Sequence, residues 1–132
     1  MERMIQKKAR IREYIDILES FGPDCKKKMR NPVLRGSILY YLYMMADSCI
    51  VLAEMIIKEK ELRPPQSYAD CIEILGENGI LDKEFSYSFA SIAGFRNFLA
   101  HDYEKTNYDQ ICDSLHHYIE DVKRFLDQIE QR

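Results

Sequence analysis

The chain has 132 residues, a length typical of one domain, and 46% of them are hydrophobic against 31% that are charged. This balance excludes a disordered chain, and the few breakers, 5 Gly and 4 Pro, leave little sequence for the turns of an all-β fold. The net charge of −3 excludes a protein that binds polyanions over its whole surface. We therefore expect an all-α protein with a single domain over residues 1–132.

Charge is unevenly distributed along the chain. Residues 1–35 carry ten Lys or Arg against five Asp or Glu, whereas residues 36–132 carry nine against seventeen. The densest basic cluster lies in a predicted turn and comprises Lys26, Lys27, Lys28, Arg30 and Arg35. Such a run is typical of a solvated loop, with contact to an RNA backbone as the alternative.

Two helices are predicted in the first half of the chain. Apolar residues spaced by three and four predict an amphipathic helix over about residues 3–20, which Gly22-Pro23 ends. Asn31 is a predicted N-cap and Pro32 the first residue of a second helix that runs to about Lys60.

The second helix contains an apolar run of membrane length, from Ile38 to Ile57. Asp47 and Glu54 fall within this run, and carboxylates are costly inside a bilayer. We therefore expect the most buried helix of a soluble bundle and no membrane contact.

The second half predicts three further helical segments. Ser67, with Asp70 three residues later, caps a short helix that reaches Leu75 and is closed by Gly76 and Gly79. A fourth segment starts at Asp82 and continues to about Leu99. A last helix, capped at Thr106 or Asn107, has apolar residues from Ile111 to Ile129 at alternating spacings of four and three. The result is an up-and-down bundle of four main helices plus one short helix.

The four cysteines, Cys25, Cys49, Cys71 and Cys112, form no C-x-x-C pair. Together with a charged N-terminus that shows no signal-peptide pattern, they indicate thiols in a reduced, cytoplasmic location. Cys112 and His116, with His117 beside them, offer two metal ligands at helical spacing, but further ligands are not evident. We expect a buried thiol beside surface histidines, and no metal or other cofactor.

Residues 96–103 read R-N-F-L-A-H-D-Y and bring together the groups that cleave a phosphodiester. Arg96 offers a planar, permanent cation for phosphate, and His101 moves protons near neutral pH. Asn97 and Tyr103 add hydrogen-bonding groups. The structural alternative is a histidine at a helix C-terminus and an arginine paired with a neighbouring carboxylate.

The spacing of this motif places a condition on the site. On a straight helix Arg96 and His101 lie about 140° apart, whereas Arg96 and Tyr103 share a face. Either the helix frays near Ala100, or the site is a cleft that is reached from two sides.

The motif resembles the R-N-x-x-x-H-x-Y signature of HEPN-fold proteins, specifically the HepT branch of HEPN/MNT toxin–antitoxin pairs. Its context is similar too, with Gly94-Phe95 before the motif, Ser67-Tyr68-Ala69-Asp70 at the start of the short helix, and Asp47 in the middle of the long one. The resemblance extends from about residue 37 to residue 108.

This resemblance implies a HEPN-like homodimer and a metal-independent endoribonuclease that acts on RNA such as tRNA or mRNA. The two motif copies would face each other in a cleft between protomers. Arg96 would bind the scissile phosphate, His101 would transfer the proton and Asn97 would orient the site. Asp47 and Asp102 are the expected supporting residues.

The family's antitoxin is a minimal nucleotidyltransferase (MNT), and the resemblance implies that this partner modifies Tyr103 with AMP. The adduct would place bulk and negative charge beside Arg96 and block RNA. The alternative function is a catalytically silent HEPN module that binds a nucleotidyltransferase or a nucleotide.

Overall fold

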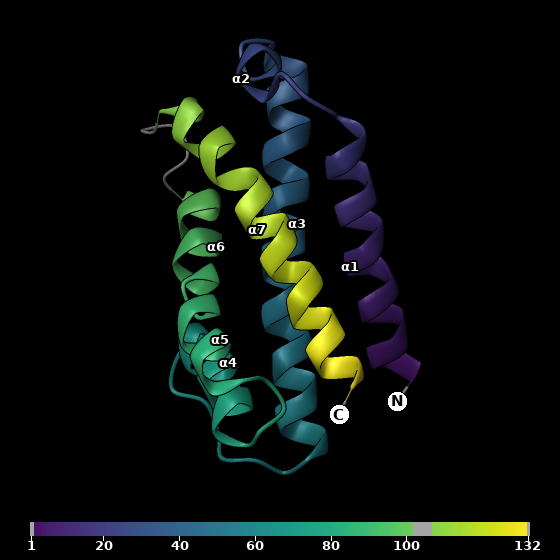
Figure 1. Cartoon of the computed structure of the whole chain (residues 1–132), viewed down its shortest axis with the longest axis vertical. Coiled ribbons are helices and arrows are strands. Elements are labelled where there is room, and N and C mark those ends of the chain that lie inside the picture. The colour runs from purple at the N-terminus through teal and green to yellow at the C-terminus, as the bar shows by residue number, and fades with distance from the viewer. Residues whose placement is uncertain (1, 102–106, 132) are drawn as a thin grey trace.

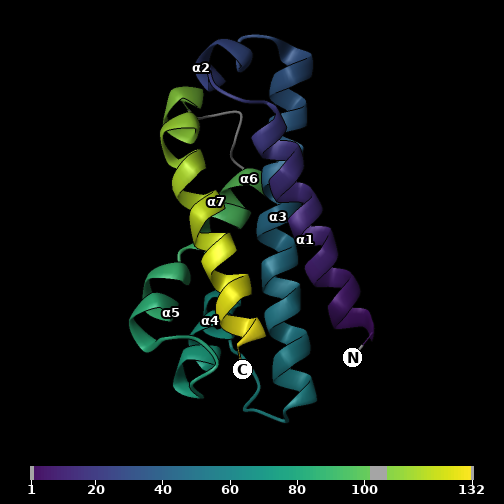
Figure 2. The ribbon, with the colours of Figure 1, turned by 45° about the vertical axis from the view of Figure 1, so that its right-hand side comes forward.

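The computed structural model describes residues 2–101 and 107–131, and these form seven helices without a strand. The long helices are α1 (Glu2–Ser20), α3 (Pro32–Glu59) and α7 (Tyr108–Glu130). The shorter ones are α2 (Cys25–Lys28), α4 (Tyr68–Glu77), α5 (Lys83–Phe89) and α6 (Ile92–His101). The long helices run along the bundle, α2 lies at one end, and α4 and α5 lie towards the other (Figures 1 and 2). The predicted all-α bundle is confirmed.

The ends of α1 and α3 follow the local signals in the sequence. Gly22 adopts a φ of +69°, which an L side chain rarely allows, just beyond the end of α1. The Asn31 side chain accepts hydrogen bonds from the backbone N–H groups of Val33 and Leu34, at 2.9 and 3.2 Å. Because Pro32 has no N–H to satisfy, the first turn of α3 is closed without an unpaired donor.

Helix α3 is the centre of the bundle. Its buried residues are Ile38, Leu39, Leu42, Met45, Ala46, Ser48, Cys49, Ile50, Leu52, Ala53, Ile56 and Ile57. By length and composition α3 is apolar enough to cross a membrane, but 56% of its apolar window is buried among the other helices. Packing against α1, α4 and α6 therefore accounts for its hydropathy.

An ion-pair cluster holds α4 in place. Ser67 caps the helix by accepting from the Asp70 N–H at 3.0 Å, as the sequence predicts. The Arg63 guanidinium donates to both carboxylate oxygens of Asp70, at 2.8 Å each, and also binds Glu77. Its hydrogen bonds lower the pKa of Asp70 from 3.8 to about 2. The cluster fixes the start of α4, and with it Tyr68.

Two predictions about residues 76–99 are wrong. Gly76 does not end α4 but lies inside it, where a Cβ would collide with the Ser86 side chain, so glycine lets α5 pack closely. The predicted fourth segment is two helices, separated at Ala90 and Ser91. Because α5 packs on α4 while α6 packs on α3, the chain turns between them although no Gly or Pro marks the break.

Helix α7 completes the bundle by burying the row of apolar residues that the sequence predicts between Ile111 and Ile129. Asn107 caps it by accepting from the Asp109 N–H at 2.9 Å, in agreement with the sequence. Its buried residues are Ile111, Ile119, Val122, Phe125, Leu126, Gln128 and Ile129. Leu115 belongs to the same row of apolar residues but is only partly buried.

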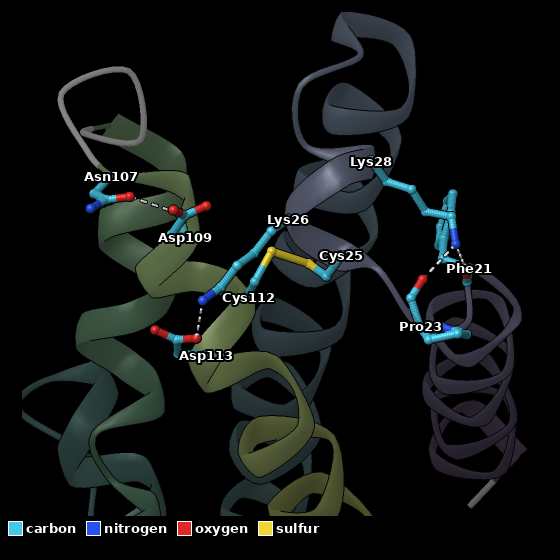
Figure 3. The surroundings of a disulfide bond; sticks show 9 residues. All are labelled: Phe21, Pro23, Cys25, Lys26, Lys28, Asn107, Asp109, Cys112 and Asp113. Carbon is cyan, nitrogen blue, oxygen red and sulfur yellow. Dashed lines mark hydrogen bonds and ion pairs between the residues drawn. A yellow bond between two sulfur atoms is a disulfide. The ribbon is translucent and has the colours of Figure 1, made fainter.

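A disulfide joins α2 to the first turns of α7. Cys25 and Cys112 are bonded across a sequence separation of 87, with their Cα atoms 5.7 Å apart (Figure 3). The disulfide corrects two predictions, that Cys112 is a buried thiol and that all four cysteines are reduced. Packing of α2 on α7 brings together two cysteines that no spacing along the sequence relates. Cys49 and Cys71 are buried free thiols, and burial raises the pKa of Cys71 to about 11.

The basic cluster around α2 contacts the protein itself. Lys26 pairs with Asp113 at 3.1 Å, and Lys28 donates to the carbonyls of Phe21 and Pro23 (Figure 3). Arg35 donates to the Met29 carbonyl at 3.1 Å. These contacts support the interpretation of the cluster as a structural turn over its alternative as an RNA-binding surface.

Reducing the disulfide should lower the thermal unfolding midpoint. A cross-link that closes so long a loop removes freedom from the unfolded chain, worth up to about 4–5 kcal/mol. We expect dithiothreitol to lower the midpoint in circular-dichroism melts by roughly 10 °C. The Cys25→Ser/Cys112→Ser variant should melt at the reduced midpoint with or without the reductant. The expectation fails if dithiothreitol leaves the midpoint of the parent unchanged although alkylation shows that Cys25 and Cys112 have been reduced.

Candidate active site

Helix α6 carries three of the predicted site residues, Arg96, Asn97 and His101. Its apolar side is fixed by burial of Ile92, Ala93 and Leu99. The Phe95 ring also stacks on Tyr118 of α7, with ring centroids 4.0 Å apart. The helix is therefore held on more than one side, which limits where its polar residues can point.

The Arg96 guanidinium is bound on three of its nitrogen atoms. Nε donates to Oδ1 of Asp47 in α3 at 3.0 Å, and Nη2 donates to the Tyr43 hydroxyl at 3.1 Å. Nη1 donates to Oδ1 of the neighbouring Asn97 at 3.1 Å. The guanidinium also lies over two aromatic rings, 5.2 Å from the centroid of Tyr43 and 5.1 Å from that of Tyr68. The predicted Asp47 and Asn97 thus meet Arg96.

These contacts leave part of the cation available. A guanidinium has five N–H donors, so among the described residues one N–H on each of Nη1 and Nη2 remains. The Arg96 side chain is 17% exposed to solvent. Partial burial lowers the pKa of Arg96, but the hydrogen bond with Asp47 and the nearby Tyr43 outweigh it and the net shift is upward. Arg96 is a charged, oriented group with two donors suited to an oxyanion.

His101 lies apart from this cluster. Helix α6 is continuous through His101, so of the two alternatives that the spacing left open, fraying near Ala100 does not occur. At five residues' separation the two side chains leave the helix about 140° apart. His101 is exposed, and its contacts within residues 2–101 and 107–131 include none with Arg96 or its partners. One chain therefore presents the cation and the imidazole on different sides of α6.

Other predicted residues are placed differently. Asp102 and Tyr103 lie outside the described residues. Cys112 is committed to the disulfide and His117 pairs with Asp121 at 3.1 Å, while His116 is exposed, so the possible Cys112–His116 ligand pair on α7 is not available. Within the described part of the chain no three His, Cys, Asp or Glu side chains gather as a metal site.

Tyr43 and Tyr68 belong to the Arg96 cluster but are absent from the predicted site. A signal existed for Tyr43, because it lies four residues before Asp47 and so shares its face of α3. Tyr68 had no such signal, since only the packing of α4 against α6 brings its ring to Arg96.

Comparison with known proteins identifies relatives of this chain. A family model described as Ribonuclease HepT-like matches residues 11–129. The mRNA nuclease HepT of Shewanella oneidensis is 28% identical over 127 residues, which cover 96% of each chain.

Solved structures show the same fold. A tri-AMPylated Shewanella oneidensis HEPN toxin in complex with MNT antitoxin is 27% identical, with a TM-score of 0.87 over 98% of this chain and 97% of that one. A toxin–antitoxin structure with AMP-PNP is 26% identical, with a TM-score of 0.90 over the whole of both chains.

The Arg96–Asp47 pair should contribute measurably to stability. Both side chains are mostly buried, at 17% and 31% exposure, and a part-buried charge depends on its partner more than a surface charge does. In a double-mutant cycle with Arg96→Ala and Asp47→Ala we expect a coupling of about 1–2 kcal/mol in denaturant unfolding. The exposed pair of Lys123 and Glu19 is the control, expected below about 0.5 kcal/mol. Equal couplings for the two pairs would contradict this expectation.

Proposed function

The chain belongs to the HepT-like ribonuclease family, and from that membership we propose that it is the toxin endoribonuclease of a toxin–antitoxin pair. The observation that carries the proposal is the Arg96 guanidinium, which is fixed by Asp47 and retains two N–H donors. A purely structural ion pair would not need a histidine five residues further along the same helix.

The proposed chemistry uses the ribose 2′-hydroxyl as the nucleophile. Arg96 binds the scissile phosphate through its two remaining N–H groups and stabilises the charge that grows on the phosphoryl oxygens. His101 either accepts the proton of the attacking hydroxyl or donates one to the leaving 5′-oxygen. Neither role requires a metal ion, so the proposal includes no cofactor.

Two of the supporting residues act through Arg96. Asp47 fixes Nε, and Asn97 fixes Nη1, so that the remaining donors keep one direction. Both are positioning residues rather than groups that contact the reacting atoms. Asp102 remains a supporting residue on the strength of the sequence motif alone.

The active unit in this proposal is a homodimer. Because Arg96 and His101 leave α6 in different directions, a second chain is the simplest source of the missing half of each site. An apolar groove of about 360 Å³ beside the site suits such a contact, lined by Gly36, Leu39, Tyr40, Tyr43, Leu99 and Ala100. Tyr40 in this groove is 55% exposed, which is costly for a monomer and is relieved by a partner.

The proposal also covers the setting of the protein. It acts in the cytoplasm on RNA, for which mRNA and tRNA are the candidates, through one HEPN-like domain over residues 1–132. The antitoxin is an MNT-type nucleotidyltransferase. Its proposed target is Tyr103, by similarity to the AMPylated toxin structure.

Removing the imidazole or the cation should abolish RNA cleavage. We expect His101→Ala to lower the rate about 10²–10⁴-fold and Arg96→Ala about 10²–10³-fold, measured on total RNA in the presence of EDTA. His117→Ala, on the exposed face of α7, is the matched control and should cleave as the parent does. Cleavage by both site variants at the parent rate would exclude the ribonuclease hypothesis and favour the silent HEPN module.

Tyr103 should be the residue that the antitoxin modifies. After incubation with the cognate nucleotidyltransferase and ATP, mass spectrometry should locate one or more AMP groups on Tyr103 and RNA cleavage should stop. Tyr103→Phe should cleave RNA but escape this inhibition, because no hydroxyl accepts the nucleotide. Tyr108→Phe is the control and should be inhibited like the parent. Inhibition of Tyr103→Phe to the same degree would disprove the assignment.

A further inference from the structure

A second groove, of about 590 Å³, meets the Arg96 cluster at Tyr68, whereas the apolar groove meets it at Tyr43. It runs between the start of α4 and the first half of α6. Its polar and aromatic lining comes from Glu54, Gln66, Ser67, Tyr68 and Asn97, with Gly94 between them. Pro65, Ala69, Cys71 and Ala93 complete the lining, so the groove differs from the apolar groove that we assign to the partner protomer by its carboxylate, amide and serine hydroxyl groups.

Tyr68 connects this groove with the proposed phosphate site. Its ring lines the groove and is 43% exposed, while the Arg96 guanidinium lies 5.1 Å from the ring centroid. An aromatic ring beside a phosphate-binding cation is how proteins hold the base of a single-stranded nucleotide, since every base has a face that can stack.

Gly94 indicates that something outside the chain approaches here. A glycine inside a helix lowers its stability, and of the three glycines within the described helices Gly76 is explained by close contact with Ser86, whereas Gly36, which lines the apolar groove, has open space at its Cβ position. At Gly94 a Cβ would meet nothing within 4 Å. Contacts among residues 2–101 and 107–131 do not account for Gly94, whereas a ligand seated in the groove that it lines would.

The polar groups in the groove distinguish between possible ligands. The Glu54 carboxylate repels a second phosphate but can accept from the amino group of a base. The Asn97 amide, whose oxygen binds Arg96, still has its nitrogen donors. An aromatic platform with donors and an acceptor around it matches a neutral, planar group with polar edges.

We propose that this groove holds the nucleobase next to the scissile phosphate, stacked on Tyr68 and approached by Asn97. The inference rests on the proposed ribonuclease function and deepens it, because it identifies the element that places single-stranded RNA against Arg96. In this arrangement Tyr68 binds substrate, and Gly94 leaves the space that the base occupies.

Binding of an uncleavable RNA tests the proposal directly. The probe is a 2′-O-methyl oligoribonucleotide of mixed sequence, compared with an abasic oligomer of the same length. Tyr68→Ala should weaken binding of the base-containing probe about 5- to 100-fold and lower binding of the abasic oligomer much less, by no more than the loss of the ring beside Arg96 causes. Tyr68→Phe should bind as the parent does, and Tyr87→Ala, at an 80% exposed tyrosine on α5, is the control.

Gly94→Ala separates a binding role from a structural one. The added methyl group meets no atom of the chain and favours the helix, so the variant should melt at or slightly above the parent temperature. Its methyl group enters the groove, so the base-containing probe should nevertheless bind more weakly. A stable variant with impaired binding is a result that damage to the fold cannot produce.

Several outcomes would overturn the proposal. The first is that Tyr68→Ala and Gly94→Ala both bind the base-containing probe as the parent does. The second is that the variants lose as much affinity for the abasic oligomer as for the base-containing probe. The third is that either substitution dissociates a dimer of the protein, which would make the groove a contact between protomers. If the parent binds the probe through Tyr68 but does not cleave RNA, the ribonuclease function fails while the base site stands. If the parent cleaves RNA, but Tyr68→Ala and Gly94→Ala bind the probe as tightly as the parent does, the base site alone fails.

Discussion

The bond between Arg96 and Asp47 is the constraint on which the site depends. It joins the short helix α6 to the middle of the buried helix α3, at an N–O distance of 3.0 Å. A guanidinium taken most of the way out of water requires a partner, and Asp47 supplies the carboxylate. With Nε bound to Asp47, Nη2 to Tyr43 and Nη1 to Asn97, the planar group is held in one orientation.

The surrounding aromatic residues strengthen this constraint. Tyr43 contributes both a hydroxyl acceptor and a ring, and Tyr68 contributes a second ring at a similar distance. Each ring comes from a different helix, so the cation ties together α3, α4 and α6. The cluster therefore links packing to the proposed function, because the contacts that hold α6 in the bundle also orient the phosphate-binding group.

Much of the fold could be predicted from the sequence because its signals are local. Asn31, Ser67 and Asn107 cap the helices that they were expected to cap, and the spacing of apolar residues identifies the buried faces. The features that were missed depend on packing instead. The Cys25–Cys112 disulfide joins residues far apart in sequence, and the turn at Ala90 exists only because α5 and α6 pack on different helices.

The candidate site likewise contains some residues that the sequence predicts and others that only the packing of the helices reveals. The motif identifies Arg96, Asn97 and His101 through their residue types and through its resemblance to the family signature, and the same resemblance indicates Asp47 in the middle of the long helix. Tyr68 joins the site only because α4 packs on α6, and no spacing of residues along the sequence predicts that contact. Nor can a single sequence reveal that α6 stays regular to His101, which separates the two main functional groups of one chain.

The central claim is that each site combines Arg96 of one protomer with His101 of its partner. Mixing the inactive variants Arg96→Ala and His101→Ala under conditions that exchange subunits tests it most directly. A shared site predicts recovery of about a quarter of the parent cleavage rate, because half of the dimers are mixed and each holds one complete site. A mixture as inactive as the separate variants, with exchange shown by native mass spectrometry, would contradict the account.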